Sequence, residues 1–267
     1  MSAFHERRWR SRDGLHLYAR DYPAVGGEAG LPVICLHGLT RNSKDFEEIA
    51  PVIAGWGRRV IVPDVRGRGL SDADPKPRNY QPKVYARDVV AMMAELGVER
   101  AVFLGTSMGG IITMTMMAIR PGAVVAAILN DVGPAMAPEG IARILSYAGK
   151  SKAIRSWDDA AAYVRQTNAI AFPDYGDEDW HRFARRTFRD TGGGPERDYD
   201  PAIAIPLGRP ASKITLWLVG IMFRRLARKR PTLLIRGELS DLITDDIASA
   251  MQRAAPAMVP VGVPNVG

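Results

Sequence analysis

Short runs of apolar residues alternate with stretches of helical periodicity through the first half of the chain. The apolar runs are residues 33–36, 60–62, 101–104 and 124–129, and the stretches of helical spacing include residues 46–53 and 82–96. A strand buried on both faces of a parallel sheet is apolar at every position, whereas a helix that covers the sheet is apolar on one side. The alternation therefore predicts β-α-β units that build a mostly parallel sheet flanked by helices.

Segments on either side of this alternation complete the predicted sheet. Residues 4–10 and 15–22 flank Asp13-Gly14, which is a typical hairpin sequence. Strand character returns at residues 232–235 and 259–263. Together with the apolar runs, these segments predict a sheet of eight strands.

A mainly helical segment at residues 134–230 interrupts the strands. Ser156 and Asp159 have the spacing of a helix capping box, and Asp177 is a suitable N-cap for a helix whose apolar stripe extends to Phe188. A helical insertion at the carboxyl edge of a sheet commonly covers a ligand pocket.

The interruption also predicts the domain organisation. We expect residues 1–133 and 231–267 to form one α/β core domain. Residues 134–230 then form a helical cap domain, inserted after the sixth strand.

Ser107 lies between the apolar run at residues 101–104 and a helical stretch that begins near Gly110. Gly105 and Gly109 stand two positions before and after it. A strand that turns at once into a helix strains its apex residue, and flanking glycines remove the Cβ contacts that would prevent the turn. A serine in this setting is a candidate nucleophile; the alternative is an ordinary serine N-cap.

Composition and charge narrow the class of protein without identifying it. The chain has 267 residues, 46% of them hydrophobic, a formal net charge of +7 and a single cysteine, Cys35. Its basic clusters lack the interleaved aromatic residues of a nucleic-acid surface, so we expect no nucleic-acid partner.

The longest apolar stretch, residues 214–223, is too short to span a bilayer. A lone cysteine in an apolar strand fits a reducing compartment, and we expect a cytoplasmic protein.

Four segments of the chain resemble sequences of the α/β-hydrolase superfamily. They are His37–Thr40, Asp64–Asp72, Gly105–Gly110 and Arg236–Asp241. The resemblance is to the bacterial branch of lidded serine esterases, enol-lactonases and carbon–carbon bond hydrolases. Serine at the apex, where haloalkane dehalogenases and epoxide hydrolases carry aspartate, separates the chain from those enzymes. The resemblance implies an α/β-hydrolase fold, a small-molecule substrate, no cofactor and no metal ion; homodimerisation stays open.

The resemblance also implies roles for individual residues. Ser107 would be the nucleophile, and the backbone N–H groups of Leu39 and Met108 would form the oxyanion hole. His37 and Gly38 would belong to the loop that approaches the substrate.

Three carboxylates are candidates for the acid of a catalytic triad. Asp241, in the loop after the seventh strand, occupies the usual family position. Asp131, at the end of the preceding strand, is the alternative acid, and Glu238 is a weaker one. For each of them the alternative role is the capping of a turn or helix.

The triad histidine is where the chain departs from the family pattern, in which it follows the last strand. Here residues 263–267 read Val-Pro-Asn-Val-Gly, and none of the four histidines follows Ser107 in a suitable loop. His37 belongs to the oxyanion loop and His181 to the predicted cap, while His5 and His16 lie in the N-terminal hairpin. We therefore expect the chain to be truncated just before its catalytic histidine and its closing C-terminal helix, and to be an impaired catalyst.

These assignments predict a serine hydrolase that cleaves a small or medium ester, thioester, lactone or carbon–carbon bond through an acyl-enzyme on Ser107. Two alternatives stay open. The absent histidine favours a non-catalytic ligand-binding protein on the same scaffold, whereas the complete elbow and Asp241 argue against it. Lyase or perhydrolase chemistry is also compatible with the triad, because a fold does not determine a reaction.

Overall fold

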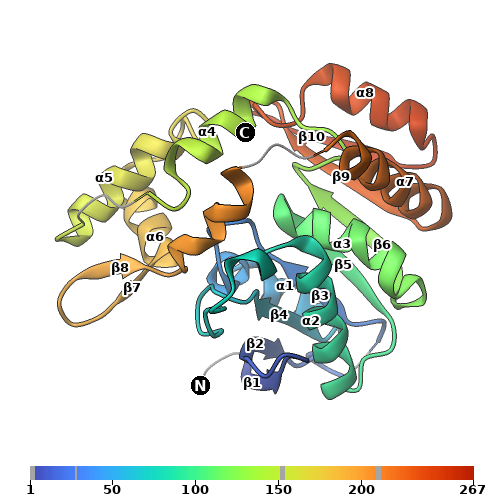
Figure 1. The fold of residues 1–267 in the computed structure, drawn as a ribbon, viewed down its shortest axis with the longest axis horizontal. Helices are drawn as coiled ribbons and strands as arrows, with labels where there is room; N and C mark the ends of the chain where they lie inside the picture. The colour runs from blue at the N-terminus through green and yellow to red at the C-terminus, as the bar shows by residue number, and fades with distance from the viewer. Residues whose placement is uncertain (1–3, 28, 151–153, 209–211) are drawn as a thin grey trace.

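An eight-stranded sheet forms the centre of the computed structural model, which describes residues 4–27, 29–150, 154–208 and 212–267. The strand order is β1-β2-β4-β3-β5-β6-β9-β10 (Figure 1). The strands span His5–Arg10 (β1), His16–Tyr22 (β2), Val33–Leu36 (β3), Val60–Asp64 (β4), Ala101–Thr106 (β5), Val124–Asn130 (β6), Thr232–Gly237 (β9) and Val259–Val263 (β10). β2 pairs antiparallel with β1 and β4, and all other pairs are parallel. The predicted mostly parallel, eight-stranded sheet is confirmed.

Helices cover both faces of the sheet, as the alternating sequence pattern predicts. They are α1 (Ile49–Gly55), α2 (Pro82–Glu95), α3 (Met108–Ile119), α7 (Lys213–Lys229) and α8 (Asp245–Ala254). Ile34 and Leu36 of β3 share one apolar cluster with residues of α2, α3, α7 and α8. Val33 and Cys35 share a second cluster with residues of α1. Because alternate side chains of a strand point to opposite faces, the two clusters lie on opposite sides of the sheet.

The inserted segment, residues 134–230, connects β6 to β9 and is mainly helical. It contains α4 (Pro138–Tyr147), α5 (Trp157–Asn168), α6 (Asp177–Thr187), the β7–β8 hairpin (Phe188–Asp190 and Pro195–Arg197), the 3-10 helix η4 (Pro201–Gly208) and α7. In Figure 1, α4, α5, α6 and the hairpin extend to the left of the sheet, whereas α7 lies at the right with α8. The inserted segment therefore has two parts with different surroundings.

The two parts of the inserted segment pack against different cores. Buried residues of α5 and α6, such as Val164 and Trp180, form a cluster of their own together with Phe188. Phe223 and Leu226 of α7 instead belong to the large core cluster that contains Ile34 and Leu36 of β3. The second half of α7 thus packs as a helix of the core, while the division of the chain into two domains stays a prediction.

Local signals within the inserted segment were mostly accurate. The capping box predicted at Ser156 and Asp159 is confirmed at the start of α5. Gly176, rather than Asp177, is the N-cap residue of α6, so that prediction was wrong by one position. The helix ends before Phe188, which lies in β7 with φ −112° and ψ 160°. Its side chain is buried against the α5–α6 cluster, which explains why the apolar period continues past the helix.

Candidate active site

Ser107 is the N-cap residue between β5 and α3, and its backbone is strained. It has φ 50° and ψ −113°, a conformation that residues other than glycine rarely adopt. Its N–H donates a hydrogen bond to the carbonyl oxygen of Asn130 on the neighbouring strand, at 3.0 Å. An outlier fixed in this way at the end of a strand places the side chain at the carboxyl edge of the sheet.

The two flanking glycines are required by close backbone contacts. A Cβ atom at Gly105 would lie 2.5 Å from the carbonyl carbon of Gly109. A Cβ atom at Gly109 would lie 2.0 Å from the carbonyl oxygen of Leu36 in β3. Both distances are far below van der Waals contact, so α3 can approach the sheet this closely only with glycine at both positions.

The loop after β3 lies against the serine. A Cβ atom at Gly38 would stand 3.9 Å from the Cβ atom of Ser107, so the loop backbone passes directly beside this residue. Within the described residues, the backbone N–H groups of Leu39 and Met108 have no hydrogen-bond acceptor. Two unsatisfied N–H groups beside a serine, one of them in the first turn of a helix, are suited to bind a developing oxyanion.

His37 is completely buried and fixes the conformation of this loop. Its Nδ1 donates a hydrogen bond to the carbonyl oxygen of Gly38 at 2.7 Å, and its Nε2 accepts one from the N–H of Val65 at 3.1 Å. Burial lowers the pKa of His37 to about 4, so the ring is neutral at physiological pH. Both ring nitrogens are therefore occupied by the backbone.

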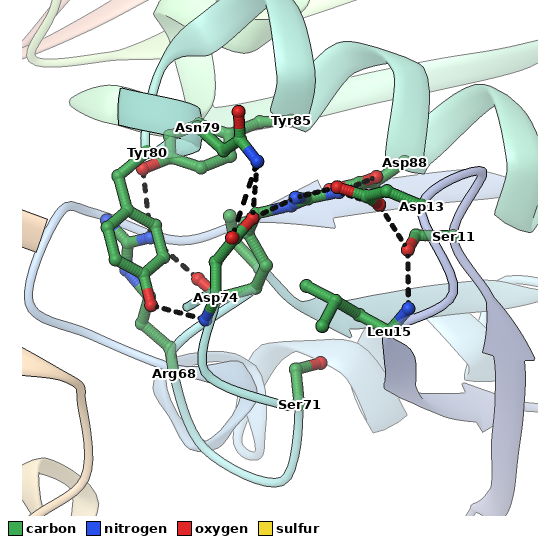
Figure 2. Close-up of polar contacts among 12 residues, drawn as sticks. Ser11, Asp13, Leu15, Arg68, Ser71, Asp74, Asn79, Tyr80, Tyr85 and Asp88 are labelled. Carbon is green, nitrogen blue, oxygen red and sulfur yellow. Dashed lines mark hydrogen bonds and ion pairs between the residues drawn. The ribbon is translucent and has the colours of Figure 1, made fainter. Parts of the chain in front are cut away.

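Arg68 contacts both residues whose N–H groups are unsatisfied. Its Nε donates to the carbonyl oxygen of Leu39 at 2.9 Å, and its Nη2 lies 3.5 Å from Sδ of Met108. Nη1 donates to the carbonyl oxygen of Arg66 and to the hydroxyl of Tyr85 (Figure 2). The planar guanidinium thus links the loop after β3 to the start of α3.

Arg66 fixes the neighbouring part of the loop after β4. Its side chain is 1% exposed and forms ion pairs with Asp13, Asp74 and Asp88, which converge at the centre of Figure 2. The bonds to Asp88 are bidentate, with both N···O distances 2.7 Å. Removing one partner of such a buried cluster would leave an uncompensated charge, so the loop has one stable conformation.

Asp131 directly follows β6 and lines the same cavity as Ser107. Its backbone also has a positive φ, 49°. Its Oδ1 accepts a hydrogen bond from the hydroxyl of Ser240 at 2.6 Å. Burial raises the pKa of Asp131, against the opposing effect of the Ser240 hydrogen bond.

Asp241 forms an ion pair with an arginine of the inserted segment. Its carboxylate forms a bidentate ion pair with Arg143 of α4, with Nη2 of the arginine 2.7 Å from Oδ1. A Cβ atom at Gly140, also on α4, would lie 2.5 Å from the carbonyl oxygen of Asp241. Asp241 does not line the cavity that contains Ser107 and Asp131 within the described part of the chain. No sequence pattern predicts this pairing, because an arginine on an amphipathic helix is ordinary.

The cavity has a volume of about 510 Å³ and lies between the carboxyl edge of the sheet and the inserted segment. This is within the range of about 300–1,000 Å³ that is typical of small-molecule sites. The sheet contributes Leu39, Ser107 and Asp131, and α4 to α6 contribute Tyr147, Tyr163 and Phe183. Gly267 also lines it.

None of the histidines at positions 5, 16, 37 and 181, all within the described residues, lines the cavity. His181 lies on α6 with 41% of its side chain exposed, 3.5 Å from a carboxylate oxygen of Asp158. His5 and His16 lie in the N-terminal hairpin. Among these histidines, none is therefore in a position to take a proton from Ser107 directly.

In the described ranges, no group of three or more histidine, cysteine, aspartate or glutamate residues could hold a metal ion. Among the helices of that same part of the chain, none is both long and apolar enough to cross a lipid bilayer.

Comparison with known proteins agrees with this geometry. A model described as the alpha/beta hydrolase fold matches residues 32–261. The chain is 32% identical over 260 residues to a 3-hydroxybutyrate-oligomer hydrolase from Cupriavidus necator. The aligned region covers 95% of this chain and 87% of that protein. The crystal structure of an alpha/beta hydrolase from Novosphingobium aromaticivorans DSM 12444 superposes with a TM-score of 0.90 at 39% identity, covering 100% of this chain and 92% of that one. The predicted fold and resemblance are confirmed: the chain belongs to the alpha/beta hydrolase family.

Proposed function

We propose that this protein is a serine hydrolase that cleaves carboxylic esters through an acyl-enzyme on Ser107. The observation that carries the proposal is the strained backbone of Ser107 beside a cavity, next to two backbone N–H groups that have no acceptor in the described part of the chain. Such strain is costly and persists where the surrounding structure serves a function. A structural serine N-cap would accept a hydrogen bond from its own helix, and Ser107 accepts none through its side chain.

In the proposed reaction, Oγ of Ser107 attacks the ester carbonyl carbon and gives its proton to a base. The N–H groups of Leu39 and Met108 stabilise the resulting oxyanion. The bond to the leaving oxygen then breaks, and the alcohol leaves with the proton that the base returns. Water attacks the acyl-enzyme by the same route and releases the carboxylic acid and free Ser107.

For the carboxylate that assists the base, we favour Asp131 over Asp241. Asp131 lines the cavity with Ser107 and has no arginine partner within the described residues, whereas the charge of Asp241 is neutralised by Arg143. A carboxylate already held by a bidentate arginine is a weaker acceptor for an imidazole N–H. Asp131 was the alternative acid in the sequence analysis, and both assignments stay predictions.

The proton acceptor of this reaction is proposed to be an imidazole. None of the histidines at positions 5, 16, 37 and 181 lines the cavity within the described residues. The test therefore supplies imidazole in solution as the acceptor.

For the substrate, we propose short oligomers of hydroxy acids. The relative from Cupriavidus necator acts on 3-hydroxybutyrate oligomers, according to its name, and it matches nearly the whole chain. The cavity is small enough to suit a short oligomer and carries both aromatic and polar side chains, as the ester and methyl groups of such a molecule require.

The test compares the protein with its Ser107→Ala variant on p-nitrophenyl butyrate and on the 3-hydroxybutyrate dimer, over a series of imidazole concentrations. We expect hydrolysis that rises with imidazole and falls by at least about a thousandfold in Ser107→Ala. Ser146→Ala, at an exposed serine of α4, is the matched control and should hydrolyse at the normal rate. Equal rates in the protein and in Ser107→Ala at every imidazole concentration would contradict the proposal.

A further inference from the structure

Four arginines line the cavity, and three of them have carboxylate partners. Arg143 pairs with Asp241, and Arg41 pairs with Asp45. Arg186 pairs with Glu47 and Glu48. The positive charge of these three side chains is thus compensated within the protein.

Arg197, the fourth, differs from the other three. Its Nε and Nη2 atoms are buried and have no hydrogen-bond partner within the described residues. Its guanidinium carbon lies 5.4 Å from the centre of the Tyr163 ring, so the aromatic face provides the nearest compensation. Arg197 lines the cavity, and within the described residues it has no carboxylate partner, so an anionic ligand in the cavity can compensate its charge.

The backbone that carries Arg197 is fixed to the core of the protein. Arg197 is the last residue of β8, and the carboxylate of the next residue, Asp198, accepts bonds from Lys44 and from Asn42. Lys44 also donates to the carbonyl oxygen of Phe188 in β7, at 2.8 Å. The hairpin is therefore attached to the loop that follows β3, and Arg197 is held at one place relative to that loop.

We propose that Arg197 binds a carboxylate of the substrate, which makes the protein selective for esters that carry a free acid group. This inference rests on the proposed ester hydrolase function and adds the substrate class. A guanidinium is planar and permanently charged, and Arg197 lines the cavity, where a carboxylate oxygen can accept a hydrogen bond from it. In a linear hydroxy-acid oligomer, the group recognised is the terminal carboxylate of the leaving alcohol portion, because the acyl portion ends in a hydroxyl.

The remaining charges in the cavity are compatible with an anionic ligand at Arg197. Asp45 is neutralised by Arg41, and Asp131 is the cavity carboxylate without an arginine partner in the described part of the chain. A substrate carboxylate is therefore expected to lie beside Arg197 and Tyr163.

The experiment measures binding without chemistry. The 3-hydroxybutyrate dimer, as free acid and as methyl ester, is titrated calorimetrically into Ser107→Ala and into the double variant Ser107→Ala with Arg197→Gln. We expect the free acid to bind about tenfold to a hundredfold more tightly than the methyl ester, and the preference to disappear in the double variant. Arg197→Lys keeps the charge but loses the planar fork, so it should retain only part of the preference.

Arg189→Gln is the matched control, because Arg189 lies on the same hairpin with an exposed side chain that pairs with Glu196. It should leave the acid preference unchanged, and a circular dichroism melt of each variant checks that the hairpin change has not unfolded the protein. Equal binding of acid and methyl ester to Ser107→Ala, or an unchanged preference after Arg197→Gln, would overturn the inference.

A second measurement separates this inference from the proposed function. Imidazole-dependent hydrolysis of the uncharged p-nitrophenyl butyrate is compared in the parent protein, Ser107→Ala and Arg189→Gln, and Arg189→Gln should match the parent. If Ser107→Ala hydrolyses that ester as fast as the parent, the proposed function fails. If only the acid preference is insensitive to Arg197, the proposed function stands and the inference fails.

Discussion

The two walls of the cavity differ in whether the main chain or the side chains form them. The sheet-side wall, which contains Gly38, Leu39, Ser107 and Asp131, depends on main-chain geometry. Two of these four residues have positive φ angles, Ser107 and Asp131. The cap-side wall, which contains Arg143, Tyr163, Phe183 and Arg197, consists of side chains on helices and a hairpin with ordinary backbone angles.

This difference separates the proposed reaction from substrate choice. Main-chain N–H groups need no particular side chain, but they stabilise an oxyanion only in an accurate position. Substitutions of the glycines that hold the sheet-side wall should therefore be poorly tolerated. Side chains on the cap-side wall can change without moving the nucleophile, so this wall can alter specificity. Substitutions in the sheet-side wall should therefore reduce stability and activity, whereas substitutions in the cap-side wall should mainly change substrate specificity.

The largest effect is expected from Gly109→Ala. The added Cβ would meet the backbone oxygen of Leu36 at 2.0 Å, and a central strand cannot move away. We expect the free energy of unfolding to fall by about 3 kcal/mol or more, with loss of the Ser107-dependent activity. Chemical denaturation monitored by circular dichroism measures this change.

Gly122→Ala is the control for that substitution. An added Cβ there meets no atom within 4 Å, and Gly122 has no positive φ angle. Its stability should change by less than about 0.5 kcal/mol. If both variants were equally stable, the sheet-side wall would not depend on its backbone contacts as we argue.

The sequence predicted the sheet-side wall because its signals are contiguous. Ser107, its two glycines and the strand and helix on either side lie within a short stretch, so local pattern alone identifies the turn. The same holds for the strands and for the Ser156 capping box, which depend on neighbours in the chain. Sequence patterns predict such features because the residues that determine them are neighbours in the chain.

The cap-side wall could not be predicted in the same way. Arg143 and Asp241 are 98 positions apart, and nothing near either residue indicates the other. The strands of the β7–β8 hairpin are short, and the buried Phe188 continues the apolar period of α6, so a longer helix was the natural prediction. The position of Arg197 in the cavity depends on that hairpin, so no local pattern around Arg197 predicts it.

The second effect in size concerns His37 and pH. Its pKa is lowered to about 4 in the folded protein from about 6.5 in the unfolded chain, so the unfolded state binds the proton first as the pH falls. The stabilisation that neutral His37 provides is complete above about pH 6.5 and is lost as the pH falls through 4. This group alone should reduce the free energy of unfolding by about 2 kcal/mol between pH 7 and pH 5.

The measurement is the free energy of unfolding as a function of pH for the protein, His37→Asn and His181→Asn. His37→Asn should be less stable at pH 7 and should lack the decrease toward pH 5. His181 is 41% exposed on the cap side, so His181→Asn should follow the parent curve. A parent curve that is flat between pH 7 and pH 5, or that His37→Asn leaves unchanged, would refute the role of His37 in the sheet-side wall.

The smallest effect distinguishes the two candidate acids and tests whether the walls are separate. Asp131→Asn removes a carboxylate from the sheet-side wall, and we expect imidazole-dependent hydrolysis of p-nitrophenyl butyrate to fall about tenfold or more, with an altered pH profile. Asp241→Asn breaks the ion pair with Arg143, which anchors α4. It should change KM and the stability of the cap side more than kcat, because Asp241 does not line the cavity within the described residues. The reverse result, with kcat lost in Asp241→Asn and retained in Asp131→Asn, would assign the acid to Asp241. In that case Arg143 would have to release the carboxylate during turnover, and the reaction would depend on the position of α4.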